Sequence, residues 1–264
     1  MHQYFDQCGR SIHLQGIPAK IISLVPSQTE LLFYLGLDTE VAGITKFCIH
    51  PPSWSKTKTH IGGTKNVHIK MVRQIQPDLI IANKEENDQR QVETMARDFP
   101  TWISDISDLE SAFYMIKSIG TITGKENVAK KLIENIRKQF ELITPPSTEL
   151  KVAYLIWKKP FMAAGGDTFI NSMLSAAGFK NVFAHLSRYP VINMDQIISS
   201  GCQFVFLSSE PYPFKEKHIS LINEYMPDCK VLLVDGEIFS WYGSRLLKAP
   251  DYFNQLRKLI KDNN

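Results

Sequence analysis

A thiol and an imidazole stand two residues apart in the stretch KFCIHPP, where Cys48 and His50 precede Pro51 and Pro52. In an extended segment, side chains at positions i and i+2 point to the same side, so these two groups are expected to face one ligand together. The pair fits a metal site, a nucleophile with its general base, or the wall of a binding pocket. A neutral imidazole is a common metal ligand, and Pro51 favours an extended backbone at His50. His50 is therefore the candidate residue for contact with a metal.

The rest of the sequence favours the pocket wall. A structural metal site needs about four ligands, and a nucleophilic cysteine needs a base from another segment together with a third, orienting group. The chain has no G-x-S-x-G elbow, no P-loop, no G-x-G-x-x-G and no H-E-x-x-H motif. A loop that follows a strand needs no special spacing to line a cleft, and open α/β sheets bind ligands at the carboxyl ends of their strands. We interpret residues 46–52 as such a loop and expect no enzymatic activity.

The composition describes an ordinary globular protein. Its 264 residues are 44% hydrophobic and 22% charged, and the net charge of +3 gives no sign of a nucleic-acid partner. The cysteines Cys8, Cys48, Cys202 and Cys229 form no C-x-x-C pair, which argues against a disulfide framework, and Cys202 and Cys229 are expected to be small core residues. No apolar run is long enough for a membrane span, and the first 14 residues lack a signal-peptide pattern. A cytoplasmic monomer is expected, or a periplasmic one if the true start lies upstream.

Strand-like and helix-like patterns alternate along the chain, which predicts parallel sheets covered by helices on both faces. Ser27 and Glu30 suggest a capping box at the start of the first helix. The expected strands cover residues 20–25, 41–45, 79–82, 102–104, 152–157, 161–164, 204–207 and 231–234. The expected helices cover residues 68–76, 87–98, 108–122, 168–177, 194–200 and 244–261.

One long helix divides the two series. Residues 126–143 carry a single apolar stripe, and Pro145 and Pro146 end the helical pattern. The sequence therefore predicts an N-terminal α/β lobe (residues 1–123), a linking helix (124–146) and a C-terminal α/β lobe (147–264).

Several segments resemble one family, the class III periplasmic solute-binding proteins of ABC importers for cobalamin, ferric siderophores and haem, and most of all its cobalamin-binding members. The first is the turn with its short strand at Asp6, Gly9, Arg10, Ile12 and Leu14; the others are AKIISLVPSQTELLFYLGL, VAGIT, Pro51-Pro52, QPDLII and KKPFMAAGGDTFINSMLSAAGFKNVFA. The resemblance implies two Rossmann-like lobes with parallel sheets, joined by one long rigid helix, with a large metal chelate bound in the cleft between them. It implies no intrinsic cofactor, because the cobalamin or ferric chelate is the ligand.

The resemblance also implies site residues. Tyrosines that precede Pro-Pro in cobalamin-binding members are replaced here by Phe47 and His50, two tryptophans are replaced by Thr64 and Asn83, and a third is kept as Trp241. Side chains at or beyond the ends of predicted strands are expected to line the cleft, namely Phe47, Cys48, His50, Thr64, Trp157, Tyr189 and Trp241. Acidic residues at the lobe tips dock such proteins on a permease, and the candidates are Glu85, Glu86 and Glu210. An alternative is a cytosolic metal-cofactor carrier or enzyme accessory protein that uses Cys48 and His50 at a bound metal.

Overall fold

The computed structural model describes residues 1–144, 146 and 148–262. The chain forms two compact units. The N-terminal unit comprises residues 1–106, 110–135 and 242–245, and the C-terminal unit comprises residues 107–109, 136–241 and 246–264. Each unit is an α/β fold, as the alternating pattern predicts.

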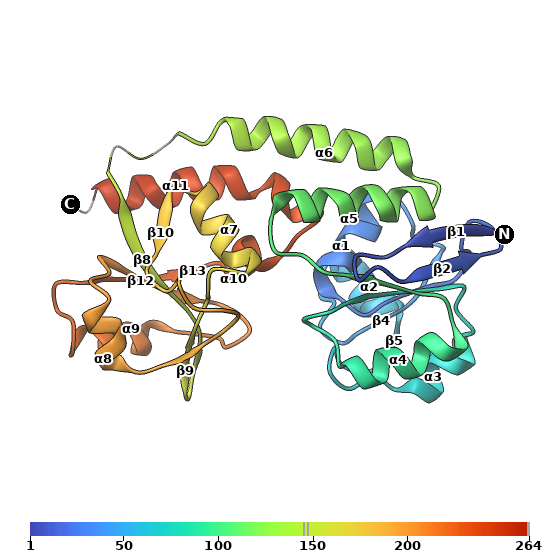
Figure 1. The fold of residues 1–264 in the computed structure, drawn as a ribbon, viewed down its shortest axis with the longest axis horizontal. Helices are drawn as coiled ribbons and strands as arrows, with labels where there is room; N and C mark the ends of the chain where they lie inside the picture. Colours follow the sequence, from blue (N-terminus) through green and yellow to red (C-terminus); the bar gives the residue numbers. More distant parts are fainter. Residues whose placement is uncertain (145, 147, 263–264) are drawn as a thin grey trace. The chain divides into compact units, whose positions relative to one another are not determined.

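The N-terminal unit is built on a five-stranded sheet in which every pair of strands is parallel, in the order β5-β4-β3-β6-β7. Helix α5 lies on one side of this sheet, and α3 and α4 lie on the other (Figure 1). A separate antiparallel hairpin, β1–β2, precedes the sheet. The strands are β1 (His2–Phe5), β2 (Ser11–Leu14), β3 (Ile21–Ser23), β4 (Val41–Ile44), β5 (Thr59–His60), β6 (Leu79–Asn83) and β7 (Thr101–Ser104). The helices are α1 (Pro26–Tyr34), α2 (Pro52–Thr57), α3 (Ile69–Ile75), α4 (Gln89–Asp98) and α5 (Leu109–Ile122).

The C-terminal unit contains a mixed sheet in the order β11-β9-β8-β12-β13, with β10 beside β8. Strands β8, β10, β12 and β13 are parallel to one another, whereas β9 and β11 are antiparallel to their neighbours. The prediction of an all-parallel sheet is therefore wrong for β9 and β11. The strands are β8 (Leu150–Lys158), β9 (Phe161–Ala163), β10 (Phe179–Asn181), β11 (Val191–Ile192), β12 (Phe204–Ser208) and β13 (Lys230–Val234). The helical segments are α7 (Phe169–Ala176), α8 (Met194–Ser199), α9 (Glu216–Asn223), α10 (Gly236–Ser240), the 3-10 turn η1 (Ser244–Leu247) and α11 (Ala249–Asp262).

Helix α6 (Glu126–Glu141) is continuous and carries the predicted apolar stripe, with Ala129, Leu132 and Ile136 all buried. The boundary between the two compact units falls inside this helix, after Asn135. The helix ends two residues before the predicted end. Of the two prolines expected to terminate it, Pro145 lies outside the described residues.

The predicted capping box of the first helix is wrong. Helix α1 begins at Pro26, and its N-cap residue is Val25, which has no side chain that can accept a hydrogen bond. Proline suits the first helical position because its missing N–H would have no partner there. The two residues of the predicted capping box have other positions and partners. Ser27 is a buried residue of the first helical turn, and Glu30 forms an ion pair with Arg245.

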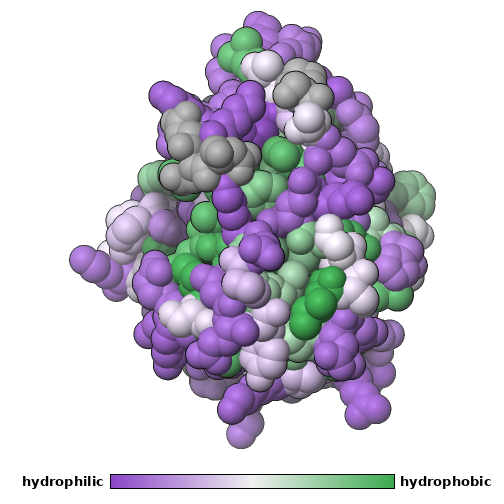
Figure 2. Space-filling view, turned by 90° about the vertical axis from the view of Figure 1, so that its left-hand side faces the viewer, coloured by the Kyte–Doolittle hydropathy of each residue, from purple (hydrophilic) through white to green (hydrophobic). Residues whose placement is uncertain are grey.

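Both sheets have apolar centres. All five residues of β6 are buried in the N-terminal unit, and all five residues of β12 are buried in the C-terminal unit. Figure 2 shows a surface in which hydrophobic side chains gather in the middle of one face and hydrophilic ones surround them. Within the described residues, no helix is both long enough and apolar enough to cross a membrane.

Candidate functional site

Cys48 lies inside the N-terminal unit, so the prediction that it lines a cleft is wrong. Its side chain has no exposed surface, and its sulfur lies 3.1 Å from Thr29 Oγ1 and 3.2 Å from Thr45 Oγ1. The segment is not extended, because the amide of Cys48 donates to the carbonyl of Thr45 and the amide of Ile49 donates to that of Phe47. These tight turns remove the alternation that would have aimed Cys48 and His50 in one direction. Burial raises the pKa of the thiol, which keeps it protonated.

Phe47 and Thr64 are brought together by neighbouring loops at the carboxyl ends of β4 and β5. The amide of Lys46 donates to the carbonyl of Gly62, and a side chain at Gly63 would lie 3.1 Å from the Phe47 ring. Glycine at this position therefore allows the ring to pack against the β5 loop. Phe47 is 51% exposed, whereas Thr64 and His50 are half-buried.

Asn83 and Asn87 hold the loops of this edge in place. The side-chain amide of Asn87 donates to the carbonyls of Leu24 and Thr64, and its oxygen accepts from the amide of Asn83. Asn83 Oδ1 in turn accepts from the amides of Glu85 and Glu86. Both asparagines are buried, so their amides satisfy backbone groups that would otherwise lack partners. We name the loops after β3, β4, β5 and β6 the N-terminal carboxyl edge.

The sequence offered a signal for only one of these asparagines. Asn83 stands where the resemblance implies a tryptophan, which marks the position without indicating its role as a loop organiser. Asn87 has the appearance of an ordinary helix-start residue. Its contact with Leu24, 63 positions earlier in the chain, cannot be read from local pattern.

A short segment near the end of the chain belongs to the N-terminal unit. The Tyr242 hydroxyl donates to the carboxylate of Glu86 over 3.1 Å, and the guanidinium of Arg245 donates two hydrogen bonds of 2.9 Å to Glu30. Gly243 has a φ of +112° and lies against Leu31 and Ser27, where a bulkier residue would be strained. The predicted docking residue Glu86 therefore also has a structural role, as the hydrogen-bond acceptor of Tyr242.

An aromatic group lies where β8 and β12 end in the C-terminal unit. Trp157 is 39% exposed and meets Tyr212 edge to face, with ring centroids 5.5 Å apart. Tyr212 also contacts Phe214 and His218. His218 is buried and its Nδ1 accepts from the amide of Lys215, while burial lowers the pKa of its imidazole and favours the neutral ring. We name Trp157, Tyr212 and His218 the aromatic group; of the three, the sequence indicated only Trp157.

Glu210 and Trp241 form a second feature of this end of the C-terminal sheet. Glu210 Oε1 accepts hydrogen bonds of 2.7 Å from the Trp241 indole and the Ser240 hydroxyl. Burial raises the pKa of this carboxyl, and the two hydrogen bonds oppose the shift. Trp241 is only 6% exposed, and its polar edge is used inside the unit. Both residues therefore help to build the edge itself.

Tyr189 follows a loop that a pair of glycines holds against the end of β9. The amides of Gly165 and Gly166 donate to the carbonyls of Arg188 and Leu186. Any side chain at Gly166 would overlap the carbonyl of Ala184, which explains the close approach of the two segments. Tyr189 is half-buried beside this loop.

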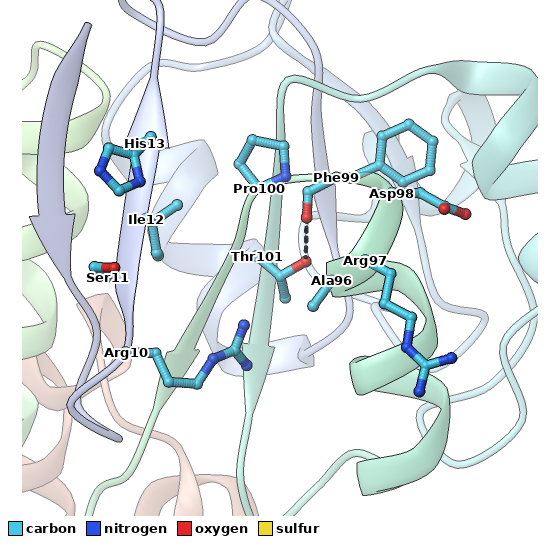
Figure 3. A pocket seen from close by; sticks show the side chains of 10 residues that line it. All are labelled: Arg10, Ser11, Ile12, His13, Ala96, Arg97, Asp98, Phe99, Pro100 and Thr101. Carbon is cyan, nitrogen blue, oxygen red and sulfur yellow. Dashed lines mark hydrogen bonds between the residues drawn. The ribbon is translucent and has the colours of Figure 1, made fainter.

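A hollow of about 300 Å³ lies at the opposite, amino-terminal end of β7, between β2 and the end of α4. Figure 3 shows Arg10 reaching across it towards Thr101, whose hydroxyl donates to the carbonyl of Phe99. It contains none of the predicted site residues. Among the described residues, no group of three or more histidine, cysteine or acidic side chains is arranged to hold a metal ion.

Both α/β units carry exposed aromatic side chains at the carboxyl ends of their strands, the edge at which open α/β sheets bind ligands. Residues 21–224 match the periplasmic binding protein family, and the chain belongs to that family. The family resemblance implied by the sequence is thus confirmed.

The similar proteins include vitamin B12-binding and heme-binding proteins. The vitamin B12-binding protein of Photorhabdus laumondii is 24% identical over 258 residues, which cover 95% of this chain and 90% of that protein. Among solved structures, the periplasmic vitamin B12 binding protein BtuF of Vibrio cholerae is 19% identical, with a TM-score of 0.76 over 92% of this chain and 98% of that one. The periplasmic heme binding protein HutB of Vibrio cholerae is also 19% identical, with a TM-score of 0.75 over 90% and 98%. The two structural similarities establish the fold.

Proposed function

We propose that the protein is the substrate-binding component of an ABC importer and captures a large metal chelate, with a corrinoid as the first candidate. The observation that carries this proposal is membership of the periplasmic binding protein family over residues 21–224. A relative named as a vitamin B12-binding protein aligns along nearly the whole chain and favours the corrinoid. Binding without catalysis is the activity expected of such a component.

The exposed aromatic side chains supply a means of holding the chelate. Phe47 presents about half of its surface at the N-terminal carboxyl edge, and Trp157 presents 39% at the end of β8. Flat apolar faces of a macrocycle bind well to aromatic side chains that a rigid scaffold holds in place. Thr64 and Tyr189, both half-buried, are proposed to supply hydroxyl groups to the site. Contact of His50 with the metal, directly or through one water, remains part of the proposal.

The alternative of a metal-cofactor carrier or enzyme accessory protein is less well supported. It requires Cys48 and His50 to act on one metal, and the Cys48 thiol is buried, protonated and occupied by two threonine hydroxyls. A thiolate is the form that binds metals, so this environment opposes ligation.

A permease is the proposed protein partner, with Glu85, Glu86 and Glu210 as docking candidates. Acidic side chains at the surface pair well with arginines of a partner through charge-assisted hydrogen bonds. Glu86 and Glu210 would first have to release Tyr242 and Trp241, which makes docking through them more costly. The expected cytoplasmic location and monomeric state remain predictions; cell fractionation and light scattering test them.

The experiment that tests the proposal is a binding screen with the purified chain. Cyanocobalamin, haemin and a ferric hydroxamate are each titrated while the absorption spectrum is recorded, and affinities are confirmed by calorimetry. Saturable binding of one molecule per chain in the micromolar range or tighter is expected for at least one chelate. Metal-free porphyrin serves as the control for non-specific apolar binding. The proposal fails if none of the chelates binds more tightly than the control.

A further inference from the structure

Two of the buried cysteines, Cys202 and Cys229, precede neighbouring strands of the C-terminal sheet. Cys202 lies two residues before β12, and Cys229 immediately precedes β13. These strands are parallel, with Phe204 opposite Lys230. The amide of Lys230 donates to the carbonyl of Gln203, so the pairing extends beyond the first residue of β12.

The register places the two cysteines within disulfide distance. If the register of β12 and β13 is continued by one residue towards their amino ends, Gln203 lies opposite Cys229. Cys202 is then one position further along its strand than the residue opposite Cys229. A strand separation of about 4.8 Å and a rise of about 3.3 Å per residue then give a Cα separation of about 6 Å. Disulfides span Cα separations of about 4.4–6.8 Å. The Cys229 thiol reaches the backbone of Cys202 and donates to its carbonyl oxygen over 3.7 Å, while the Cys202 thiol donates to the carbonyl of Ile197 over 3.8 Å. Both cysteine side chains belong to the same buried apolar cluster.

We propose that Cys202 and Cys229 are a site of reversible oxidation and form an intramolecular disulfide that joins the amino ends of β12 and β13. Both sulfurs lie in the apolar core of the unit, where the side chains are 7% and 8% exposed. The inference is independent of the proposed function.

The pKa values of the two thiols are shifted in opposite directions, which indicates which cysteine reacts first. The interaction with Cys229 lowers the pKa of Cys202, and the same interaction together with burial raises the pKa of Cys229. The thiolate is the attacking species in thiol–disulfide exchange. Cys202 therefore attacks one sulfur of glutathione disulfide and releases one glutathione thiolate. Cys229 loses its proton and attacks the mixed disulfide at the Cys202 sulfur, which releases the second glutathione; two protein thiols are oxidised and one glutathione disulfide is reduced.

The bond would enclose residues 203–228. This loop carries the strand β12 and, at its far end, Glu210 and Tyr212, two of the residues that shape the candidate site. A cross-link of this length restricts the unfolded chain and is expected to raise the unfolding midpoint of the oxidised protein by about 5–10 °C. Oxidation would thereby stabilise the part of the C-terminal unit that supports the site.

The test uses the whole chain, unfolded under reducing conditions and refolded in buffers of increasing glutathione disulfide, so that burial does not block the reaction. Free thiols are alkylated, and the protein is digested with trypsin without reduction. A cross-linked pair of the peptides 189–215 and 218–230 is expected, with Cys8 and Cys48 alkylated. The variants C202S and C229S should lack this pair, and C8S should keep it.

Some outcomes would overturn the proposal. The proposal is overturned if Cys202 and Cys229 are recovered as separately alkylated thiols or as glutathione adducts at every ratio tested. It is also overturned if the cross-link falls on Cys8 or Cys48. Either result shows that the two sulfurs do not meet in the folded unit.

Discussion

Replacing Trp157 with alanine measures how much the aromatic group contributes to chelate binding. A tryptophan has an accessible surface on the order of 250 Å². Because 39% of Trp157 is exposed, about 100 Å² remains for a ligand to cover. At about 25 cal/mol per Å², complete coverage is worth about 2.5 kcal/mol and coverage of half is worth about 1.2 kcal/mol. The dissociation constant of Trp157→Ala should therefore rise between about tenfold and about 70-fold.

The substitution also removes the edge-to-face contact with Tyr212, which is expected to cost about 0.5–1.5 kcal/mol of stability. Urea unfolding measures this loss separately. Calorimetric titration with the chelate selected in the screen then measures binding by a chain that is still folded at the assay temperature. Trp157→Phe, which keeps an aromatic ring, should recover most of the affinity.

Tyr225→Ala is the matched control. Tyr225 is an aromatic side chain of the same unit and is 59% exposed, but it lies at the opposite, amino-terminal end of β13. Its removal should leave the dissociation constant unchanged. If Trp157→Ala binds the chelate as tightly as Tyr225→Ala and the wild type, Trp157 is no part of the site and the placement of the ligand at the strand ends is refuted.

Two further predictions concern the polar contacts behind the site. Because the pKa of Glu210 is raised, the folded state binds the proton of this carboxyl more tightly than the unfolded state does. Proton binding at Glu210 therefore stabilises the fold fully below the ordinary pKa of 4.5, and this stabilisation is lost as the pH rises through the folded-state pKa. The stability of Glu210→Gln relative to wild type should therefore improve as the pH rises above 4.5, as measured by urea unfolding across the pH range; a difference that is constant with pH would contradict this assignment. Arg245→Met should destabilise the N-terminal unit by about 3–5 kcal/mol, because Glu30 would lose its partner in a pair that is 8% and 16% exposed. The double variant Glu30→Gln/Arg245→Met should lose less than Arg245→Met alone, and simple addition of the two single effects in a double-mutant cycle would exclude a coupled pair.

Local pattern was sufficient for most of the fold. Buried parallel strands such as β6 and β12 are short apolar runs bounded by polar residues, and such runs are visible in a single sequence. The long amphipathic helix α6 was equally visible in the sequence. The antiparallel orientation of β9 and β11 could not be predicted from the sequence. The orientation of a strand in a sheet depends on the neighbour with which it pairs and not on its own residues.

The site was predicted less well because its geometry depends on turns and distant partners. Two consecutive turn hydrogen bonds rotate Cys48 into the core, and nothing in the residue types of KFCIHPP distinguishes that backbone from an extended one. Tyr212 was missed because it becomes an aromatic partner of Trp157 only through the pairing of β8 with β12. The positions at which strands end can be read from the local sequence pattern, whereas residues that support them from another strand cannot.

The insertion of residues 242–245 into the N-terminal unit has a consequence for the order of folding during synthesis. Domains generally fold as units while the ribosome is still extending the chain, beginning with the N-terminal one. Here the last strand of the N-terminal sheet ends at Ser104. Glu30 can pair with Arg245, and Glu86 with Tyr242, only when the last part of the 264-residue chain has been made. The N-terminal unit therefore begins to emerge first but is completed only when residues 242–245 have been made, and the half-buried carboxylate of Glu30 has no guanidinium partner from Arg245 until then. A chain truncated before Tyr242 should leave not one damaged unit but two.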